Sequence, residues 1–295
     1  GIIEAMESVS YQPVLGVQWH PECMLAEENR VMMPIFNWLV KEAKLYSKAK
    51  QFHCNNLTLD SHCDSPMFFD CGAHFNVKNP DIEVSYEYVG EESPDGSATF
   101  SYNPLVDIHK MTDGGLDAVF MVAYLRQLER SDEMLQAATA KADRLLSLIE
   151  QRISECNGLA AIAYSPEELY KNKQNGVKSV VLGIENGYAI AKDINNVSRY
   201  ADLGVSYMTL CHNGDNDICD SARGKYEHNG LSAFGKEVVM EMNRVGMMVD
   251  MSNASDKRFY DVLEFSKEPV ICAHSYGRTA CGHRRNLTDG QMTAL

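Results

Sequence analysis

The sequence lacks the features of a membrane-spanning protein and of a nucleic-acid-binding protein. None of its apolar runs approaches the roughly 20 residues that a helix needs to cross a bilayer, and no secretory signal precedes the first apolar segment. Basic residues are scarce relative to acidic ones: 27 lysines and arginines face 41 aspartates and glutamates, which gives a formal net charge of −14. This charge disfavours nucleic acid and anionic membranes as partners.

The cysteines lack the even number and close spacing of a disulfide framework in a small secreted domain. There are nine of them, scattered along the chain, and Cys211 in YMTLCH and Cys272 in PVICAHS lie within apolar, strand-like runs. This pattern predicts reduced, mostly structural thiols and a cytoplasmic location. Hydrophobic residues make up 45% of the 295 residues, so the chain can bury the core of one large domain or of two smaller ones.

The first 50 residues differ from the rest of the chain. An apolar segment at 1–6 and an apolar strand at 13–19 precede the motif His20-Pro-Glu22. A helix is expected at 27–46, where apolar residues recur at three- and four-residue spacing on one face. A basic, polar stretch ends at Lys50 and leads into a predicted linker at 51–56. We therefore expect an N-terminal unit at 1–50 and a second unit at 57–295.

Near-continuous apolar strands alternate with amphipathic helices in the second unit. Strands are expected at residues 56–60, 117–124, 179–184, 205–210, 247–251 and 270–273, and helices at 131–156, 194–203, 232–245 and 255–265. The polar stretch 66–104 between the first two strands indicates an inserted loop region. Apolar strands separated by helices are typical of a parallel sheet covered on both faces, as in a doubly wound sheet or a (β/α)8 barrel.

Polar residues follow these strands at their carboxyl ends. The first strand runs into His62 and Asp64, and later strands end at Glu185, His212 and His274. In an α/β barrel such ends form one face, so residues far apart in sequence converge there. Two histidines, an aspartate and a glutamate can together hold a divalent metal, which lowers the pKa of bound water to about 7 and polarises a carbonyl group. Each motif alone is a weak signal, but their arrangement at successive strand ends fits amide hydrolysis.

Six segments of the second unit, in order and with matching spacing, carry a family resemblance: LDSHCDSP, VVLGIENG, LGVSYMTLCHN, GLSAFGKEVVMEMNRVGMMVDMS, PVICAHS and RRNLTD. Residues 57–295 thereby resemble the renal (membrane) dipeptidase family, a branch of the amidohydrolase-type TIM barrels with a binuclear zinc site. The resemblance implies that His62 and Asp64 bind the first zinc ion, that Glu185 bridges both ions, and that His274 binds the second.

The same resemblance assigns two residues to the substrate. His212 is expected to contact the scissile carbonyl oxygen or the reaction intermediate, and Arg285 is expected to bind the substrate carboxylate. A planar guanidinium suits that task because it can donate two parallel hydrogen bonds. His212 and Glu185 are accordingly the predicted catalytic residues.

The sequence departs from the family pattern in two places. Asn253, in Asp250-Met-Ser-Asn253, stands where the family has a second-metal histidine in an Asp-Leu-x-His pattern. Asparagine offers only a neutral carbonyl oxygen, so the second metal site is expected to be weak, empty or filled by a different ion. The family's last conserved aspartate has no counterpart before Leu295. We therefore expect an incomplete barrel, part of a longer protein.

The segment GVQWHPE and the amphipathic helix after it carry a second resemblance, to the C-terminal end of a class I glutamine amidotransferase-like domain. The γ-glutamyl-γ-aminobutyrate hydrolase branch is the most similar. The resemblance implies that His20 and Glu22 are the base and the orienting residue of a Cys-His-Glu triad. Cys23 follows the motif and cannot be the nucleophile, so we expect this unit to be inert in the present chain.

Together these features predict a zinc-dependent dipeptidase that uses a metal-activated water, fused to a γ-glutamyl hydrolase-like domain. Two alternatives stay open: a single-metal amidohydrolase acting on another amide or a lactone, and a degenerate barrel that binds a peptide without cleaving it. The expected partner is a dipeptide or another small molecule, and assembly into a homodimer stays open.

Overall fold

The computed structural model describes residues 5–7, 15–17, 33–77, 82–87, 97–102 and 106–295. The chain separates into two compact units, Gly1–Asn56 and Leu57–Leu295. Within the described residues, no helix is both long and apolar enough to cross a membrane.

The N-terminal unit contains one strand pair and one long helix. Strand β1 (Ala5–Glu7) pairs antiparallel with β2 (Leu15–Val17), and helix α1 spans Met33–Asn55. The helix continues nine residues past the predicted end at residue 46, so the segment expected as a linker is helical. His20 and Glu22 lie outside the described residues.

The second unit is built on a parallel sheet whose strands lie in chain order. Its strands are β3 (Leu59–Cys63), β6 (Ala118–Tyr124), β8 (Lys178–Glu185), β9 (Val205–Thr209) and β10 (Met248–Asp250), in the order β3-β6-β8-β9-β10, with β7 (Ala160–Ile162) beside the start of β8. All pairings among them are parallel. Sequential parallel strands that curl in this way form half of a barrel, and this confirms the predicted parallel α/β architecture.

The last predicted strand, at 270–273, is wrong in extent. In the described part of the chain this segment is joined to the sheet by a single parallel bridge, between Asp250 and Ile271. The prediction of 66–104 as loop is also wrong in part. It contains helix α2 (Pro66–Phe69) and an antiparallel hairpin, β4 (Ile82–Glu87) with β5 (Ser97–Tyr102).

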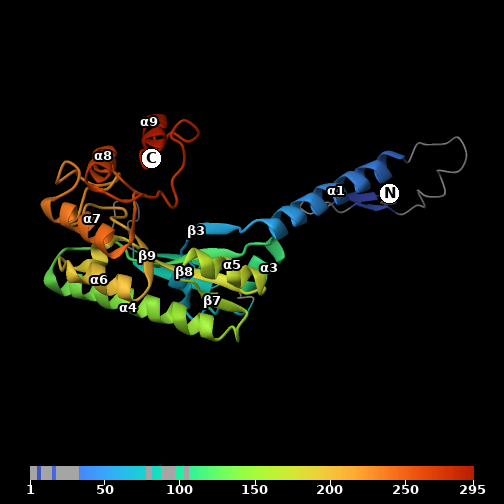
Figure 1. Cartoon of the computed structure of the whole chain (residues 1–295), viewed down its shortest axis with the longest axis horizontal. Coiled ribbons are helices and arrows are strands. Elements are labelled where there is room, and N and C mark those ends of the chain that lie inside the picture. The colour runs from blue at the N-terminus through green and yellow to red at the C-terminus, as the bar shows by residue number, and fades with distance from the viewer. Residues whose placement is uncertain (1–4, 8–14, 18–32, 78–81, 88–96, 103–105) are drawn as a thin grey trace, which may run out of the picture. The chain divides into compact units, whose positions relative to one another are not determined.

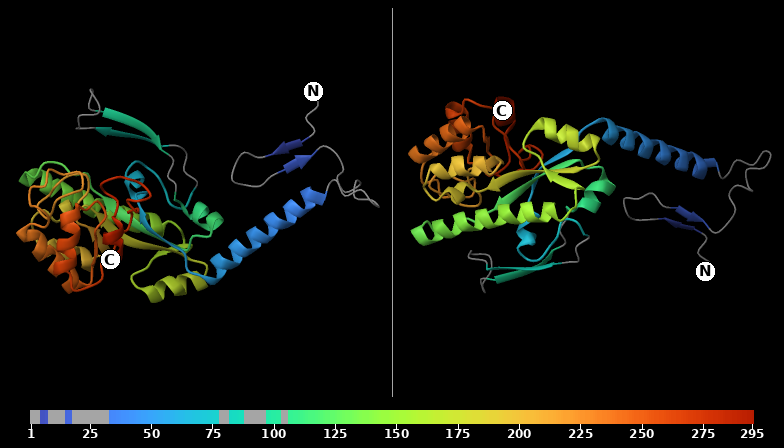
Figure 2. Two further views of the ribbon diagram at one scale, coloured as in Figure 1. Left: turned by 90° about the horizontal axis from the view of Figure 1, so that it is seen from above. Right: turned by 60° about the horizontal axis from the view of Figure 1, so that its bottom comes forward.

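Helices connect the strands and cover the sheet. They are α3 (Ile108–Gly114), α4 (Asp132–Ser154), α5 (Pro166–Gln174), the 3-10 helix η2 (Gly187–Ile190), α6 (Asn195–Asp202), α7 (Ala233–Val245), α8 (Asp256–Phe265) and α9 (Asp289–Ala294). Figure 1 shows α4 running along one side of the strands, and both views of Figure 2 show the orange-to-red C-terminal part gathered at one end of the sheet.

Local sequence signals explain where these helices begin. Ser131, Ser232 and Ser255 each accept a hydrogen bond from the backbone N–H three residues on, and so cap α4, α7 and α8. The predicted apolar face of α4 is buried, and Leu145 and Ile149 are at most 1% exposed. Burying each such side chain contributes about 1.5–3 kcal/mol.

One irregularity of the sheet bears on function. The ladder between β3 and β6 shifts register between Asp60 and Cys63, where the carboxyl end of β3 is reached. A bulge of this kind re-aims side chains, and the residues inside it are Ser61 and His62.

Candidate metal centre

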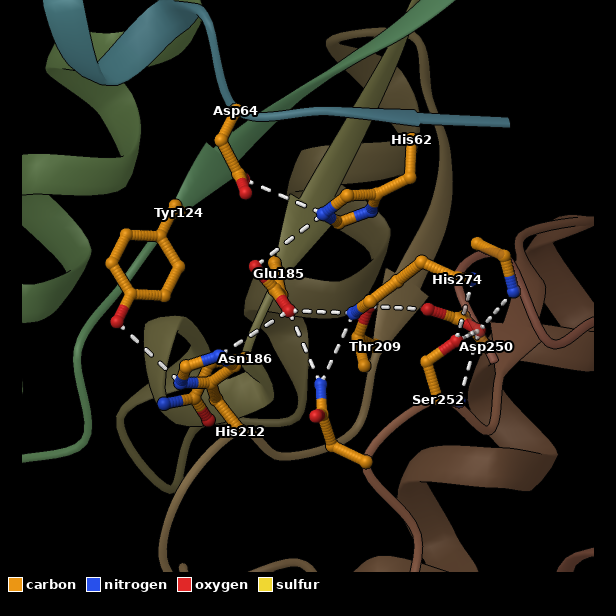
Figure 3. Close-up of polar contacts among 12 residues, drawn as sticks. His62, Asp64, Tyr124, Glu185, Asn186, Thr209, His212, Asp250, Ser252 and His274 are labelled. Atoms are coloured by element: carbon orange, nitrogen blue, oxygen red, sulfur yellow. Dashed lines mark hydrogen bonds and ion pairs between the residues drawn. The ribbon is translucent and has the colours of Figure 1, made fainter. Parts of the chain in front are cut away.

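The carboxyl ends of neighbouring strands bring four of the predicted site residues together. His62 lies near the end of β3, Glu185 is the last residue of β8, and His212 follows β9. His274 follows the Asp250–Ile271 bridge. One possible ligand atom each from His62, Glu185 and His274 lies within 4.8 Å of the others (Figure 3). The half-barrel thus concentrates three side chains that can bind a metal.

Glu185 is the centre of this group. Its Oε2 lies 3.5 Å from His62 Nε2, whereas its Oε1 lies 3.0 Å from His274 Nε2 and 3.6 Å from His212 Nε2. Burial alone would raise the pKa of Glu185. The hydrogen bonds from His274 and His62 outweigh this effect and lower the pKa below its usual value, so the carboxylate is ionised. Because its two oxygens face different imidazoles, the carboxylate has the orientation needed to bridge two cations.

A buried tyrosine fixes the ring of His62. Tyr207 Oη lies 2.8 Å from His62 Nδ1 and 3.2 Å from the carbonyl oxygen of Ser61. The carbonyl can only accept, so Tyr207 donates to Ser61 and accepts the Nδ1–H of His62. This assignment leaves Nε2, the atom that faces Glu185, as the ligand atom of His62.

The charges around His62 favour a cation at Nε2. Burial lowers the pKa of His62, but the hydrogen bonds to Asp64 and Glu185 raise it more, to about 10. Asp64 Oδ1 is buried, and its contact with His62 Nε2, at 3.4 Å, is long for a hydrogen bond. A buried carboxylate oxygen with only a long contact to a donor is costly unless a cation satisfies it.

His212 stands on the other side of Glu185 and differs from His62 in charge. Burial lowers the pKa of His212, so its imidazole is neutral at pH 7. Its Nδ1 lies 3.5 Å from Tyr124 Oη, at the end of β6. A neutral imidazole can donate a hydrogen bond from one nitrogen to a carbonyl oxygen.

Asn253 lies inside the site. Its amide Nδ2 is 3.2 Å from Glu185 Oε1 and 3.3 Å from His274 Nε2, and its backbone has a left-handed φ of 63°. The NH2 group donates hydrogen bonds and cannot coordinate a metal, so in this orientation Asn253 links Glu185 to His274 directly.

Three residues that support the site carry no assignment from the sequence. Asp250 is fully buried, and its Oδ1 accepts hydrogen bonds from Ser252 N (3.0 Å) and Ala273 N (2.9 Å), while its Oδ2 accepts from Thr209 Oγ1 (2.5 Å). Ser252 Oγ in turn accepts from His274 N at 3.1 Å (Figure 3). An Asp-x-Ser sequence that begins at the last residue of a strand, as here in β10, is a signal for such a side-chain-stabilised turn.

Arg285 approaches the same site from the C-terminal segment. Its Nη2 donates to the carbonyl oxygen of His274 at 2.9 Å, and its Nε is buried without a hydrogen-bond partner. Its positive charge contributes to lowering the pKa of His212. A guanidinium with an unused buried donor can take a carboxylate as a ligand.

The chain belongs to the membrane dipeptidase family (peptidase family M19), whose sequence model matches residues 46–295. Dipeptidase verJ from Clonostachys rogersoniana is 31% identical over 262 residues, which cover 84% of this chain and 62% of that protein. Dipeptidase 3 from Rattus norvegicus is 31% identical over 199 residues, 64% of this chain and 38% of that protein.

The fold is shared with the crystal structure of the probable dipeptidase PvdM from Pseudomonas aeruginosa. The two superpose with a TM-score of 0.73 at 22% identity, over 85% of this chain and 60% of that chain. The chain therefore spans less than two thirds of the length of each of these three relatives.

Proposed function

We propose that the full-length protein is a zinc-dependent dipeptidase that hydrolyses the peptide bond of dipeptides by a metal-activated water. The observation that carries this proposal is the orientation of Glu185, a buried carboxylate whose two oxygens face different histidines. The dipeptidase names of the relatives support the choice of substrate.

The residues of the site fit a zinc ion. Imidazole nitrogens and carboxylate oxygens are ligands that zinc binds, and the buried Asp64 Oδ1, which has only a long contact to His62, lies in the same place. His62, Asp64 and Glu185 would hold a first ion, and Glu185 and His274 a second. Zinc, when bound, supplies a Lewis acid that polarises the peptide carbonyl and makes water nucleophilic near neutral pH.

The chain's own residues would orient the dipeptide. His212, neutral and close to Glu185, would donate a hydrogen bond to the scissile carbonyl oxygen and stabilise the charge that develops there. Arg285 would bind the free C-terminal carboxylate and so restrict the substrate to very short peptides. Asp250 and Ser252 hold the backbone of the segment that carries His274.

Asn253 favours a variation on this proposal. Since its amide NH2 group lies against Glu185 and His274, a second ion would have one imidazole ligand fewer than the family pattern provides. A single-metal amidohydrolase acting on another amide or a lactone is therefore the second candidate. A barrel that binds peptides without cleaving them is the third.

The test combines metal content with activity in the full-length protein. Zinc per chain is measured after loading and dialysis, and initial rates are measured with a panel of dipeptides. We compare Glu185→Gln with His109→Gln, a control at an exposed histidine of α3. The proposal predicts bound zinc and dipeptide hydrolysis in the wild type and the control, and a loss of at least about 10³-fold in rate for Glu185→Gln.

Each other outcome favours a different function for the protein. Bound zinc without hydrolysis of any dipeptide would favour the binding barrel, and one zinc ion with activity on a different amide would favour the single-metal amidohydrolase. A wild type that binds no zinc would reject the metal centre altogether.

We also propose that residues 1–50 derive from a γ-glutamyl hydrolase-like domain of the full-length protein, with His20 and Glu22 as triad members. This proposal is supported by the sequence motif alone. It requires a nucleophilic cysteine upstream of Gly1 in the full-length protein, and sequencing that region tests it.

A further inference from the structure

Arg258 is an arginine in an unfavourable place. It is fully buried, and it lies in the first turn of α8, where the helix dipole disfavours a cation. Among the described residues no carboxylate lies within ion-pairing distance of its guanidinium, and its buried Nε has no hydrogen-bond partner. Burying a charge without an ionic partner costs several kcal/mol, so stability alone does not account for this residue.

The guanidinium joins two segments that border the metal centre. Its Nη1 lies 2.8 Å from Cys211 Sγ and 3.2 Å from Cys219 Sγ. Its Nη2 donates to the carbonyl oxygens of Met251 and Ser252, both at 3.0 Å. The Nη1 group of the guanidinium therefore contacts two thiols, and its Nη2 group binds the turn after β10.

Both segments carry candidate site residues. Cys211 immediately precedes His212, and the Met251–Ser252 carbonyls immediately precede Asn253. Ser252 also accepts the backbone N–H of His274. Further contacts tie the two segments together: the Asn253 carbonyl oxygen accepts from Ala222 N at 2.9 Å and from Cys211 Sγ at 3.7 Å.

The two thiols take the place of a carboxylate partner. Both are fully buried, as is the guanidinium between them and the turn. Burial raises the pKa of Cys219, but the hydrogen bond from Cys211 and the charge of Arg258 outweigh it and lower the pKa to about 7. A thiol sulfur is ordinarily a weak hydrogen-bond acceptor. Because the pKa of Cys219 is lowered, its sulfur has more thiolate character and accepts a hydrogen bond from the guanidinium more strongly.

We propose that Arg258 is a positioning residue of the metal centre: its guanidinium, anchored on Cys211 and Cys219, fixes His212 and the Asn253 turn relative to each other. This inference rests on the proposed zinc site: Arg258 holds Ser252, and Ser252 accepts the backbone N–H of the proposed zinc ligand His274. Replacing the Arg258 guanidinium by an apolar group leaves the fold intact, but His212, Asn253 and His274 are then held less rigidly. Residues that orient metal ligands from behind typically change metal affinity or activity 10–100-fold when replaced.

The decisive experiment measures zinc affinity by chelator competition, together with kcat and KM for a dipeptide, in the full-length protein. Arg258→Met keeps the unbranched side chain and removes the charge and the donors. Lys257→Met, at the preceding residue of α8, whose side chain is half exposed, is the matched control. We expect Arg258→Met to fold, to bind zinc about 10–100-fold more weakly than the control, and to lose more in kcat than in KM.

Two further variants keep the proposal refutable. Arg258→Lys retains the positive charge but lacks the two donor groups of the guanidinium. We expect it to recover only a small part of the zinc affinity and kcat that Arg258→Met loses. Cys219→Ser removes one anchor with little change in volume, and we expect a fall in zinc affinity of about 3–10-fold. If Arg258→Met does not fold, Cys219→Ser alone decides.

Several results would overturn the proposal. They are zinc affinity and kcat of Arg258→Met within twofold of the control, full recovery in Arg258→Lys, or an unchanged zinc affinity in Cys219→Ser. Failure of the proposed function is distinguishable, because a wild type that binds zinc but cleaves no dipeptide still shows the affinity differences among these variants.

Discussion

The hydroxyl of Tyr207 provides a sensitive test of the metal centre, because Tyr207→Phe removes one oxygen atom and changes no charge. Tyr207 is fully buried, and its Oη contacts both His62 Nδ1 and the Ser61 carbonyl oxygen. Without it, the His62 ring loses the hydrogen bond that selects its tautomer. The Ser61 carbonyl loses a donor in the same step.

The expected magnitudes follow from these two contacts. A buried polar group left without a partner costs about 1–3 kcal/mol, and part of this cost is offset because the buried hydroxyl itself is removed. We therefore expect the unfolding free energy of the metal-free protein to fall by about 1–2 kcal/mol. Because the ring that carries the ligand atom Nε2 is no longer held, zinc affinity should fall by about 10–100-fold.

Tyr200→Phe is the matched control for this change. Tyr200 is equally buried, but its hydroxyl interacts with the Ala189 carbonyl at 3.4 Å and with Arg199 and Asp143, away from the site. Urea unfolding and chelator competition are measured for both variants of the full-length protein. The reasoning is refuted if Tyr207→Phe binds zinc within twofold of Tyr200→Phe, because the tyrosine would then have no influence on His62 as a ligand.

Three further predictions concern the second ion, the substrate and the pH dependence of stability. Asn253→His should raise the zinc content per chain by up to one ion, measured by elemental analysis, and an unchanged content would show that Asn253 does not limit the second site. Arg285→Met should raise KM about 10–100-fold for a dipeptide, and a much smaller rise for the matching C-terminal amide is expected; equal effects on both would contradict carboxylate binding. Asp117→Asn should destabilise the protein by about 1–2 kcal/mol at pH 7 because Asp117 accepts from Lys173 Nζ at 2.6 Å and from Thr58 N at 3.0 Å. Burial raises the pKa of Asp117, but these donors lower it below 3.8 overall, so its stabilisation is present above that pH and is lost as the pH falls further. Urea unfolding should therefore show the full difference between Asp117→Asn and the wild type at pH 7 and a difference that shrinks as the pH falls below 3.8.

Elements set by short-range patterns were predictable from the sequence. The strand around residues 179–184 is apolar at successive positions because both faces of a parallel strand are covered, and the structure buries all but its first residue. The helix after Ser131 begins there because a serine side chain can replace the missing backbone acceptor. Such signals need only a few neighbouring residues.

Elements that depend on distant partners were predicted less well. The first strand of the sheet was expected at 56–60 but spans Leu59–Cys63, because its register is set by pairing with β6 and by the bulge there. Strand β7 and helix α5 were not predicted at all: β7 is three residues long and exists through its pairing with β8. For both strands the deciding hydrogen bonds come from another part of the chain, whereas α5 begins at a local cap, Ser165, that went unrecognised in the sequence.

The sequence by itself determined which chemical groups the site contains. Histidines and carboxylates stand at the ends of successive strands, and parallel strands necessarily place their carboxyl ends along one edge of the sheet. The tertiary structure decided how these groups are used. It turned the two oxygens of Glu185 towards different imidazoles, placed Tyr207 behind His62 across 145 residues of sequence, and enclosed Arg258 between two thiols and a turn. Side-chain orientation and burial depend on packing between distant segments, and no local pattern in the sequence encodes that packing.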